Sequence, residues 1–219
     1  MTSFAITTRE ALLIVRPANP WSAEQHLQGQ QPESIAADPG HPARLYCGTL
    51  GHGLWCSSDA GRSWQPAGPG IPQAEITAVA VAPAAGPGSG VVFAGTGPST
   101  LSRSADGGHS WQALPALLEL PSSSRWSFPP QPDTHHVRWI EIDPHQADKL
   151  YVAIEAGALV RSADGGRSWQ DRVSGGPIDT HTAATHRQAA GWIYSAAGDG
   201  YIESGDGGRS WSRLMDGLG

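Results

Sequence analysis

The chain has 219 residues, and its 28 glycines and 18 prolines favour short strands joined by tight turns over long helices. The net charge of −6, without any Lys/Arg cluster, argues against nucleic acid as a partner. No segment approaches the roughly 20 apolar residues that span a bilayer, and residues 1–20 lack the pattern of a signal peptide. We therefore expect a cytoplasmic all-β protein without a membrane partner.

Strand patterns follow one another along the whole chain. The first 30 residues predict three strands, at 4–8, 11–15 and 21–27. Four longer patterns then begin with an apolar inner strand, predicted at 34–38, 76–82, 137–143 and 180–185. A second strand follows each of them, predicted at 45–49, 91–96, 150–154 and 192–196. In the third of these patterns, further strands predicted at 159–162 and 169–172 follow those at 137–143 and 150–154, which gives a four-stranded unit.

The only two cysteines, Cys47 and Cys56, lie in predicted strands joined by the turn at residues 50–53. This placement allows them to face each other across a hairpin. In a reducing cytosol we expect two free thiols, because cytosolic disulfides are rare. A metal site at the cysteines lacks support, since no second Cys pair or suitably spaced His accompanies them.

An eight-residue motif, S-x-D-x-G-x-S-W, occurs four times and ends at Trp64, Trp111, Trp169 and Trp211. The tryptophans are 47, 58 and 42 residues apart, which is the range of one four-stranded blade of a β-propeller. The repeats therefore predict an all-β fold of four-stranded antiparallel propeller blades.

The residue types of the motif suit a tight turn between two strands. The aspartates can accept N–H bonds from the turn that follows them, the glycines permit a positive φ, and each Trp anchors the hairpin on the neighbouring core. A catalytic acid has no reason to recur in every blade, so we interpret the motif as structural: Asp59, Asp106, Asp164 and Asp206 with Gly61, Gly108, Gly166 and Gly208.

In this strand context the motif resembles the Asp-box, or bacterial neuraminidase repeat, proteins. That family includes sialidases, the luminal domains of sortilin-type receptors, a photosystem II assembly factor and many bacterial proteins of the glycosyl-hydrolase-like subgroup whose activity is unknown. The resemblance implies a β-propeller and leaves the activity open, because one fold hosts many functions.

The predicted blades form a single domain over residues 1–219. Residues 1–30 are a degenerate partial blade, and the blades with the motif span 31–70, 71–118, 134–175 and 176–216. About five blades leave the closure of a ring unexplained, and an open ring would expose strand edges. We expect part of a six- or seven-bladed propeller; the alternatives are an unusual five-bladed seam and closure by a partner chain.

A long inserted loop at residues 112–136 explains the 58-residue interval, and a Pro-rich, aromatic insertion of this length is more often functional than idle. It lies on the face opposite the Asp boxes, where propeller sites usually occur. Alignment of the inner strands places Glu33, Thr77, Arg138 and His181 at equivalent heights, with Glu75, His136 and Asp179 one level further out. The candidate ligand-binding residues at this channel mouth are Trp126, Asp133, His135, His136, Arg138, Glu155, His181 and Asp199.

Three chemistries fit these residues. Histidines and carboxylates can bind a divalent metal, with His135, His136 and His181 as the candidate ligands, or perform acid–base chemistry, and Arg138 can clamp an anionic ligand. The alternative is that they are solvated loop residues. No other cofactor is implied.

Three functions follow. The first is a non-catalytic binding or assembly propeller that holds a protein, peptide or glycan at the channel mouth. The alternative is a metal-dependent hydrolase or lyase that uses the histidine cluster. The third is a sialidase-like glycosidase, which the resemblance ties to three arginines around the substrate carboxylate. Only Arg138 is well placed for that role, because Arg62, Arg167 and Arg209 belong to the repeated motif.

Overall fold

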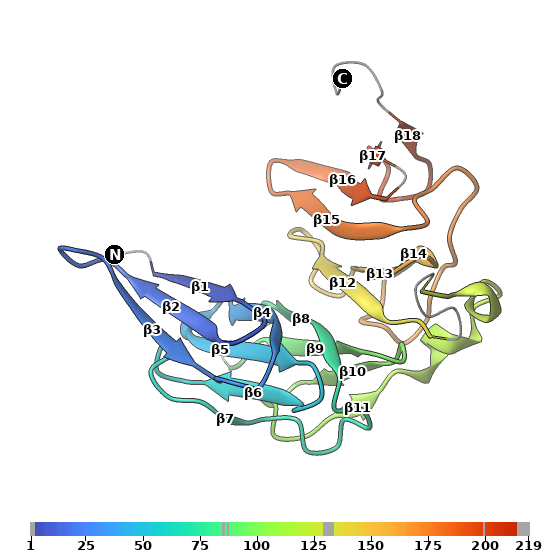
Figure 1. Cartoon of the computed structure of the whole chain (residues 1–219). Coiled ribbons are helices and arrows are strands. Elements are labelled where there is room, and N and C mark those ends of the chain that lie inside the picture. The colour runs from blue at the N-terminus through green and yellow to red at the C-terminus, as the bar shows by residue number, and fades with distance from the viewer. Residues whose placement is uncertain (1–2, 85, 87, 129–133, 199, 214–219) are drawn as a thin grey trace. The chain divides into compact units, whose positions relative to one another are not determined.

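The computed structural model describes residues 3–84, 86, 88–128, 134–198 and 200–213, and its regular structure is almost entirely antiparallel β-sheet (Figure 1). The chain forms two compact units. Unit 1 comprises residues 1–96 and 102–113, and unit 2 comprises residues 97–101 and 114–219. Within the described ranges, no helix has the length and apolar character needed to cross a membrane.

Unit 1 holds three sheets in which each strand pairs with its neighbours in sequence. The first sheet has three strands: β1 (Phe4–Thr7), β2 (Leu12–Arg16) and β3 (Ser22–His26). The second has four: β4 (Pro32–Asp38), β5 (His41–Thr49), β6 (Leu54–Ser57) and β7 (Gln65–Pro66). The third sheet has β8 (Ile76–Ala82), β9 (Val91–Thr96), β10 (Leu101–Ser104) and β11 (Gln112–Ala113). The first residue of β10, Leu101, is assigned to unit 2.

Unit 2 holds two further sheets of the same connectivity. The first has β12 (Val137–Ile142), β13 (Leu150–Ile154) and β14 (Ala158–Ser162), and a single bridge between Arg161 and Gln170 marks the place of a fourth strand. The second has β15 (Thr180–His186), β16 (Ala189–Ala197), β17 (Gly200–Ser204) and β18 (Ser212–Arg213). These meanders are propeller blades, which confirms the predicted fold class.

The inserted segment is less of a loop than the sequence predicts. After β11 it forms two short 3-10 helices, η1 (Pro115–Glu119) and η2 (Ser123–Arg125). Leu117 and Trp126 are buried, and the backbone N–H and hydroxyl of Ser122 both donate to the Asp171 carboxylate, at 2.8 and 2.5 Å. The segment folds because its apolar side chains pack into unit 2, a contact that local sequence does not reveal.

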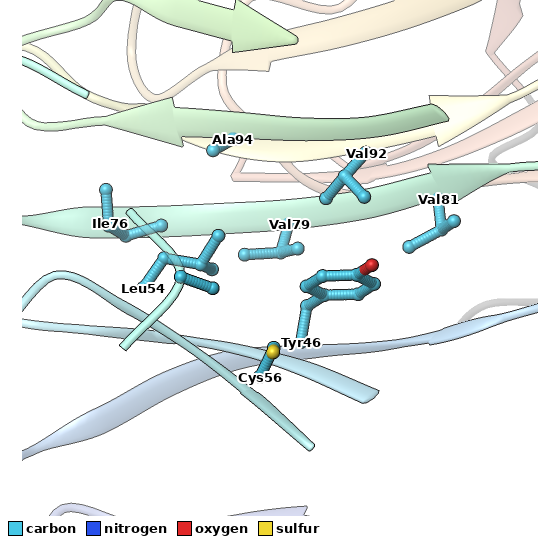
Figure 2. Close-up of a cluster of buried hydrophobic side chains, with 9 residues drawn as sticks. Tyr46, Leu54, Cys56, Ile76, Val79, Val81, Val92 and Ala94 are labelled. Carbon is cyan, nitrogen blue, oxygen red and sulfur yellow. The ribbon is translucent and has the colours of Figure 1, made fainter. Parts of the chain in front are cut away.

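The core of unit 1 lies between the sheets that contain β4–β7 and β8–β11. Figure 2 shows the side chain of Tyr46 reaching from β5 towards Val79 and Val81 of β8, with Leu54 and Ile76 beside them. Tyr46 and Ile76 are fully buried, so the second strand of one blade packs on the inner strand of the next. Removal of this apolar surface from water supplies the main stabilising term of the unit.

The two cysteines do not face each other, so that expectation is wrong. The register of β5 and β6 pairs Tyr46 with Cys56 and Cys47 with Trp55. Successive side chains of a strand point to opposite faces, so Cys56 packs with Tyr46 while Cys47 packs with Leu12 on the other side. Both thiols are free and buried, and burial raises the pKa of Cys47 to about 12.

The four copies of the motif, hereafter the repeat turns (residues 57–64, 104–111, 162–169 and 204–211), share one hydrogen-bond pattern. In the first, the Ser57 hydroxyl donates to Asp59 at 2.8 Å and accepts the Gly61 N–H at 2.8 Å. Asp59 also accepts the Ser63 N–H and hydroxyl, at 2.9 and 2.7 Å. Hydrogen bonds from the equivalent serine hydroxyl lower the pKa of all four aspartates, that of Asp164 to about 2.

Candidate functional site

The repeat turns and the predicted site lie at opposite ends of the sheets in unit 2. In the pair β13–β14, Ser162 at the start of a repeat turn lies opposite Leu150, whereas Ile154 lies opposite Ala158 at the other end. The pair β16–β17 has the same arrangement, with Ser204 opposite Ile193 and Gly200 opposite Ala197. Glu155 and the residues near it are therefore separated from the repeat turns by the full length of a strand.

Every inner strand has a β-bulge near its first residue. The register skips one residue between Pro32 and Ser34, between Ile76 and Ala78, between Val137 and Trp139, and between Thr180 and Thr182. The skipped residues are those that the sequence places at equivalent heights: Glu33, Thr77, Arg138 and His181. A bulge redirects a side chain out of the regular alternation, and bulges are common beside functional sites.

Glu155 is the centre of the first part of the site. Its carboxylate lies 2.8 Å from Nε2 of His136 and 3.6 Å from Nε of Arg138, the bulged residue of β12. Its backbone N–H donates to the carbonyl of His136 at 3.2 Å. Glu155 and His136 are thus joined through both backbone and side chain. The result is a fixed, partly buried group of one carboxylate, one imidazole and one guanidinium.

Asp179, just before β15, is the centre of the second part. Its carboxylate accepts the Ala156 N–H at 3.0 Å and lies 3.6 Å from Nε2 of His181, the bulged residue of β15. Its backbone carbonyl accepts the Gly198 N–H at 2.8 Å. A β-carbon at Gly198 would collide with the Asp179 carboxylate, so the close approach requires glycine. Asp179 thus links the turn after β13 to the start of β15.

The structure joins these two parts. One ligand atom each from Glu155, Asp179 and His181 lie within 4.8 Å of one another. Carboxylate oxygen and imidazole nitrogen are ligands of divalent metals, so the donor set fits such an ion. Of the three histidines predicted as metal ligands, only His181 belongs to this group.

His135 and His136 have other contacts. The His135 ring packs edge-on against Trp126 at a centroid distance of 5.9 Å, and the His136 ring packs on Phe128 at 5.4 Å. Burial, and then the charge of His136, lower the pKa of His135, which favours its neutral form. Aromatic packing therefore fixes both rings within the inserted segment, and His136 also contacts Glu155.

The remaining predicted residues divide into buried and undescribed ones. Trp126 is only 5% exposed, and its Nε1–H donates to the Ser122 hydroxyl at 3.0 Å. The Trp126 ring packs closely on Gly157, where an added β-carbon would lie 2.9 Å from the ring. Trp126 is therefore a packing residue beside the site. Asp133 and Asp199 lie outside the described residues. Sequence reasoning missed Asp179 as a candidate ligand-binding residue. Its position in the alignment of the inner strands, one level further out than His181, is the signal that could have identified it.

No family model and no curated protein matches the chain. Among solved structures, the GH74 enzyme of Niastella koreensis matches with a TM-score of 0.69 at 16% identity, over 92% of this chain and 34% of that one. The GH74 xyloglucanase from Xanthomonas campestris matches with a TM-score of 0.53 at 17% identity, over 94% of this chain and 43% of that one. A chain of the nidogen–laminin complex matches with a TM-score of 0.57 at 11% identity, over 90% of this chain and 72% of that one.

This chain thus spans about a third of the length of the Niastella enzyme that it resembles. At such identities the similarity concerns the backbone fold, which is common to enzymes and to other proteins. The comparisons show that the chain has a β-propeller fold.

Proposed function

We propose that the chain is a binding module that recognises a peptide segment of a protein partner at the ends of β12 and β15. The observation that carries the proposal is the pair of bulges that directs Arg138 and His181 to one place, beside the carboxylates of Glu155 and Asp179. We name this group of four residues, with His136, the bulge site. Three of its side chains are accessible to a ligand: His181 with 49%, Arg138 with 35% and Asp179 with 34% of the side chain exposed.

The two carboxylates of the bulge site orient its exposed nitrogen groups. Glu155 already contacts His136 and Arg138, and Asp179 already accepts a backbone N–H and contacts His181. These contacts use one oxygen of each carboxylate, Oε2 of Glu155 and Oδ1 of Asp179. They hold Arg138 and His181 in fixed positions, which lowers the entropy cost of binding an acceptor group.

The chemistry of the exposed groups favours a partner with carbonyl or carboxylate oxygens. A guanidinium donates up to five hydrogen bonds in a fixed fork, and an imidazole adds a sixth donor. A peptide backbone presents such acceptors at regular intervals. The nidogen–laminin complex, which this chain resembles in fold, is a complex between proteins and supports the proposal at that coarse level.

The test is a selection of peptides from a random displayed library on the full chain, followed by calorimetry with the tightest binder. Loss of one charge-assisted hydrogen bond should weaken binding about tenfold, so Arg138→Gln and His181→Gln should each raise Kd by about that factor. Glu33→Gln, at the equivalent bulge of β4, is the matched control and should leave Kd unchanged. A peptide whose Kd is insensitive to Arg138 and His181, or the failure to select any peptide, contradicts the proposal.

A metal-dependent hydrolase or lyase is the second candidate, and the convergence of Glu155, Asp179 and His181 favours it. Under this hypothesis the chain, stripped with a chelator, binds one equivalent of Zn²⁺ in calorimetry, and His181→Ala abolishes the binding. A chelator added to the peptide experiment separates the candidates. Peptide binding that survives the chelator favours the binding module, and peptide binding that the chelator abolishes favours the metal site.

A further inference from the structure

A second polar pocket lies in unit 2 at the end of the sheets that carries the repeat turns, away from the bulge site. It has a volume of about 380 Å³ and lies between the turn before β13 and the end of β14 on one side and the last repeat turn on the other. Three of its lining side chains are cationic, namely Lys149, Arg161 and Arg209, and one is acidic, Asp206. We call it the cationic pocket.

The position of Lys149 is fixed from behind. Its ammonium lies 3.0 Å from the carboxylate of Asp143, which is 4% exposed, and 5.3 Å from the centre of the Tyr151 ring. Asp143 also accepts the N–H of His145 at 2.9 Å. The ammonium therefore sits at the wall of the pocket with a buried counter-charge on its far side.

Arg161 brings donors that the protein does not use. One terminal nitrogen donates to the carbonyl of Gly207 at 3.3 Å, while its Nε is buried and has no hydrogen-bond partner among the described residues. Because Nε is shielded from solvent, only the terminal nitrogens of Arg161 can meet a ligand. Arg161 and Arg209 both line the pocket, and burial, followed by the nearby charge of Arg209, lowers the pKa of Arg161.

The one carboxylate in the lining is already committed. Asp206 accepts the hydroxyl of Ser204 at 2.8 Å, the N–H of Arg209 at 2.9 Å and both donors of Ser210, at 2.9 and 2.7 Å. These bonds are those of the repeat turn itself. The facing guanidiniums are thus left without a dedicated counter-ion inside the pocket.

Unit 1 has the same framework with a different outcome. Arg44, Cys56 and His109 occupy the places of Lys149, Arg161 and Arg209 relative to the buried tyrosine and the next repeat turn, since Tyr46 pairs with Cys56 as Tyr151 pairs with Arg161. A cysteine and a histidine thus replace the two arginines, and Arg44 donates to the hydroxyl of Ser89. The excess of cationic donors is therefore specific to unit 2.

We propose that the cationic pocket is a binding site for an oxyanion, a phosphoryl or carboxylate group held between Arg161, Arg209 and Lys149. Guanidinium forks match the oxygens of both groups, and a 380 Å³ space admits a group larger than one inorganic ion. The proposal is independent of the peptide proposal, because none of the bulge-site residues lines this pocket.

The experiment is a titration of the full chain with inorganic phosphate, followed by backbone amide NMR, with chloride exchanged to keep ionic strength constant. A parallel titration with succinate separates phosphoryl from carboxylate recognition. We expect saturable shifts at the amides of Gly191 and Gly207, which line the pocket, with at least one of the two anions. Arg209→Gln changes an exposed residue and should weaken that binding about tenfold.

Arg167→Gln is the matched control, since Arg167 occupies the same position in the preceding repeat turn and donates to the carbonyl of Asp164 at 3.1 Å. It should bind as the unchanged chain does. Shifts that never saturate with either anion, an affinity that Arg209→Gln leaves unchanged, or an equal loss in Arg167→Gln would each overturn the proposal.

Discussion

The inner strands β8 of unit 1 and β15 of unit 2 share one backbone plan but differ in what they bury. All seven residues of β8 are buried, whereas β15 buries only Thr180 and Ala183. Counted from the bulge, Val79 corresponds to Ala183 and Val81 to Thr185. Apolar side chains of β8 are thus replaced by smaller or polar ones in β15.

The link to the neighbouring blade changes accordingly. In unit 1, β8 packs on Tyr46 and Leu54 of the preceding sheet. In unit 2, the Glu141 carboxylate of β12 accepts the N–H and hydroxyl of Thr185, at 2.9 and 2.6 Å. These charge-assisted hydrogen bonds add to an apolar cluster in which Ala183 packs with Tyr151 of the preceding sheet. The inner strand of unit 1 thus depends more on apolar burial, and that of unit 2 more on hydrogen bonds to a carboxylate.

The largest expected effect is on the core of unit 1. Ile76→Ala removes a fully buried side chain and should lower the free energy of unfolding by about 3 kcal/mol. Thr180→Ala, at the equivalent position of β15, removes a hydroxyl bonded to Ser195 and should cost about 1 kcal/mol. Urea unfolding measures both changes, and hydrogen exchange shows which unit is affected. Equal costs would remove the energetic distinction between the two inner strands.

Acid should have a smaller effect and should act on both units. The Ser168 hydroxyl and other donors lower the pKa of Asp164 from 3.8 to about 2. A lowered pKa in the folded state means that stability is complete above pH 3.8 and is lost as pH falls towards 2. Asp164→Asn should be less stable at neutral pH and should lose less on acidification, which thermal unfolding at several pH values measures. If hydrogen exchange shows acid opening in unit 1 alone, the turns do not stabilise the two units alike.

The smallest effect concerns the first repeat turn. Ala60 has a φ of 60°, where the later turns have glycine, such as Gly165 with a φ of 72°. Ala60→Gly should therefore raise the free energy of unfolding by about 0.5–1 kcal/mol, because glycine adopts this conformation without strain. Gly165→Ala is the reciprocal change and should lower it, as measured by urea unfolding. A loss of stability in Ala60→Gly would show that the turn in unit 1 is not strained.

Much of the candidate site followed from local spacing. Arg138, His136, Glu155 and His181 were selected from their positions relative to the inner strands, and the structure brings them near one another. The bulges at Arg138 and His181 could not be predicted, because a register shift depends on the partner strand. The contact between His135 and Trp126 also escaped prediction, since it depends on how the inserted segment folds back.

Local residue patterns specify the blades, because the repeat turns satisfy their own hydrogen bonds within eight residues and need no distant partner. They also specify the order of the strands, which pair with their neighbours along the chain. Three features depend on the three-dimensional fold: Cys47 and Cys56 point apart, Trp126 is buried, and Asp179 joins Glu155 and His181. Each of these facts depends on packing between segments far apart in sequence, which local patterns of residues do not encode.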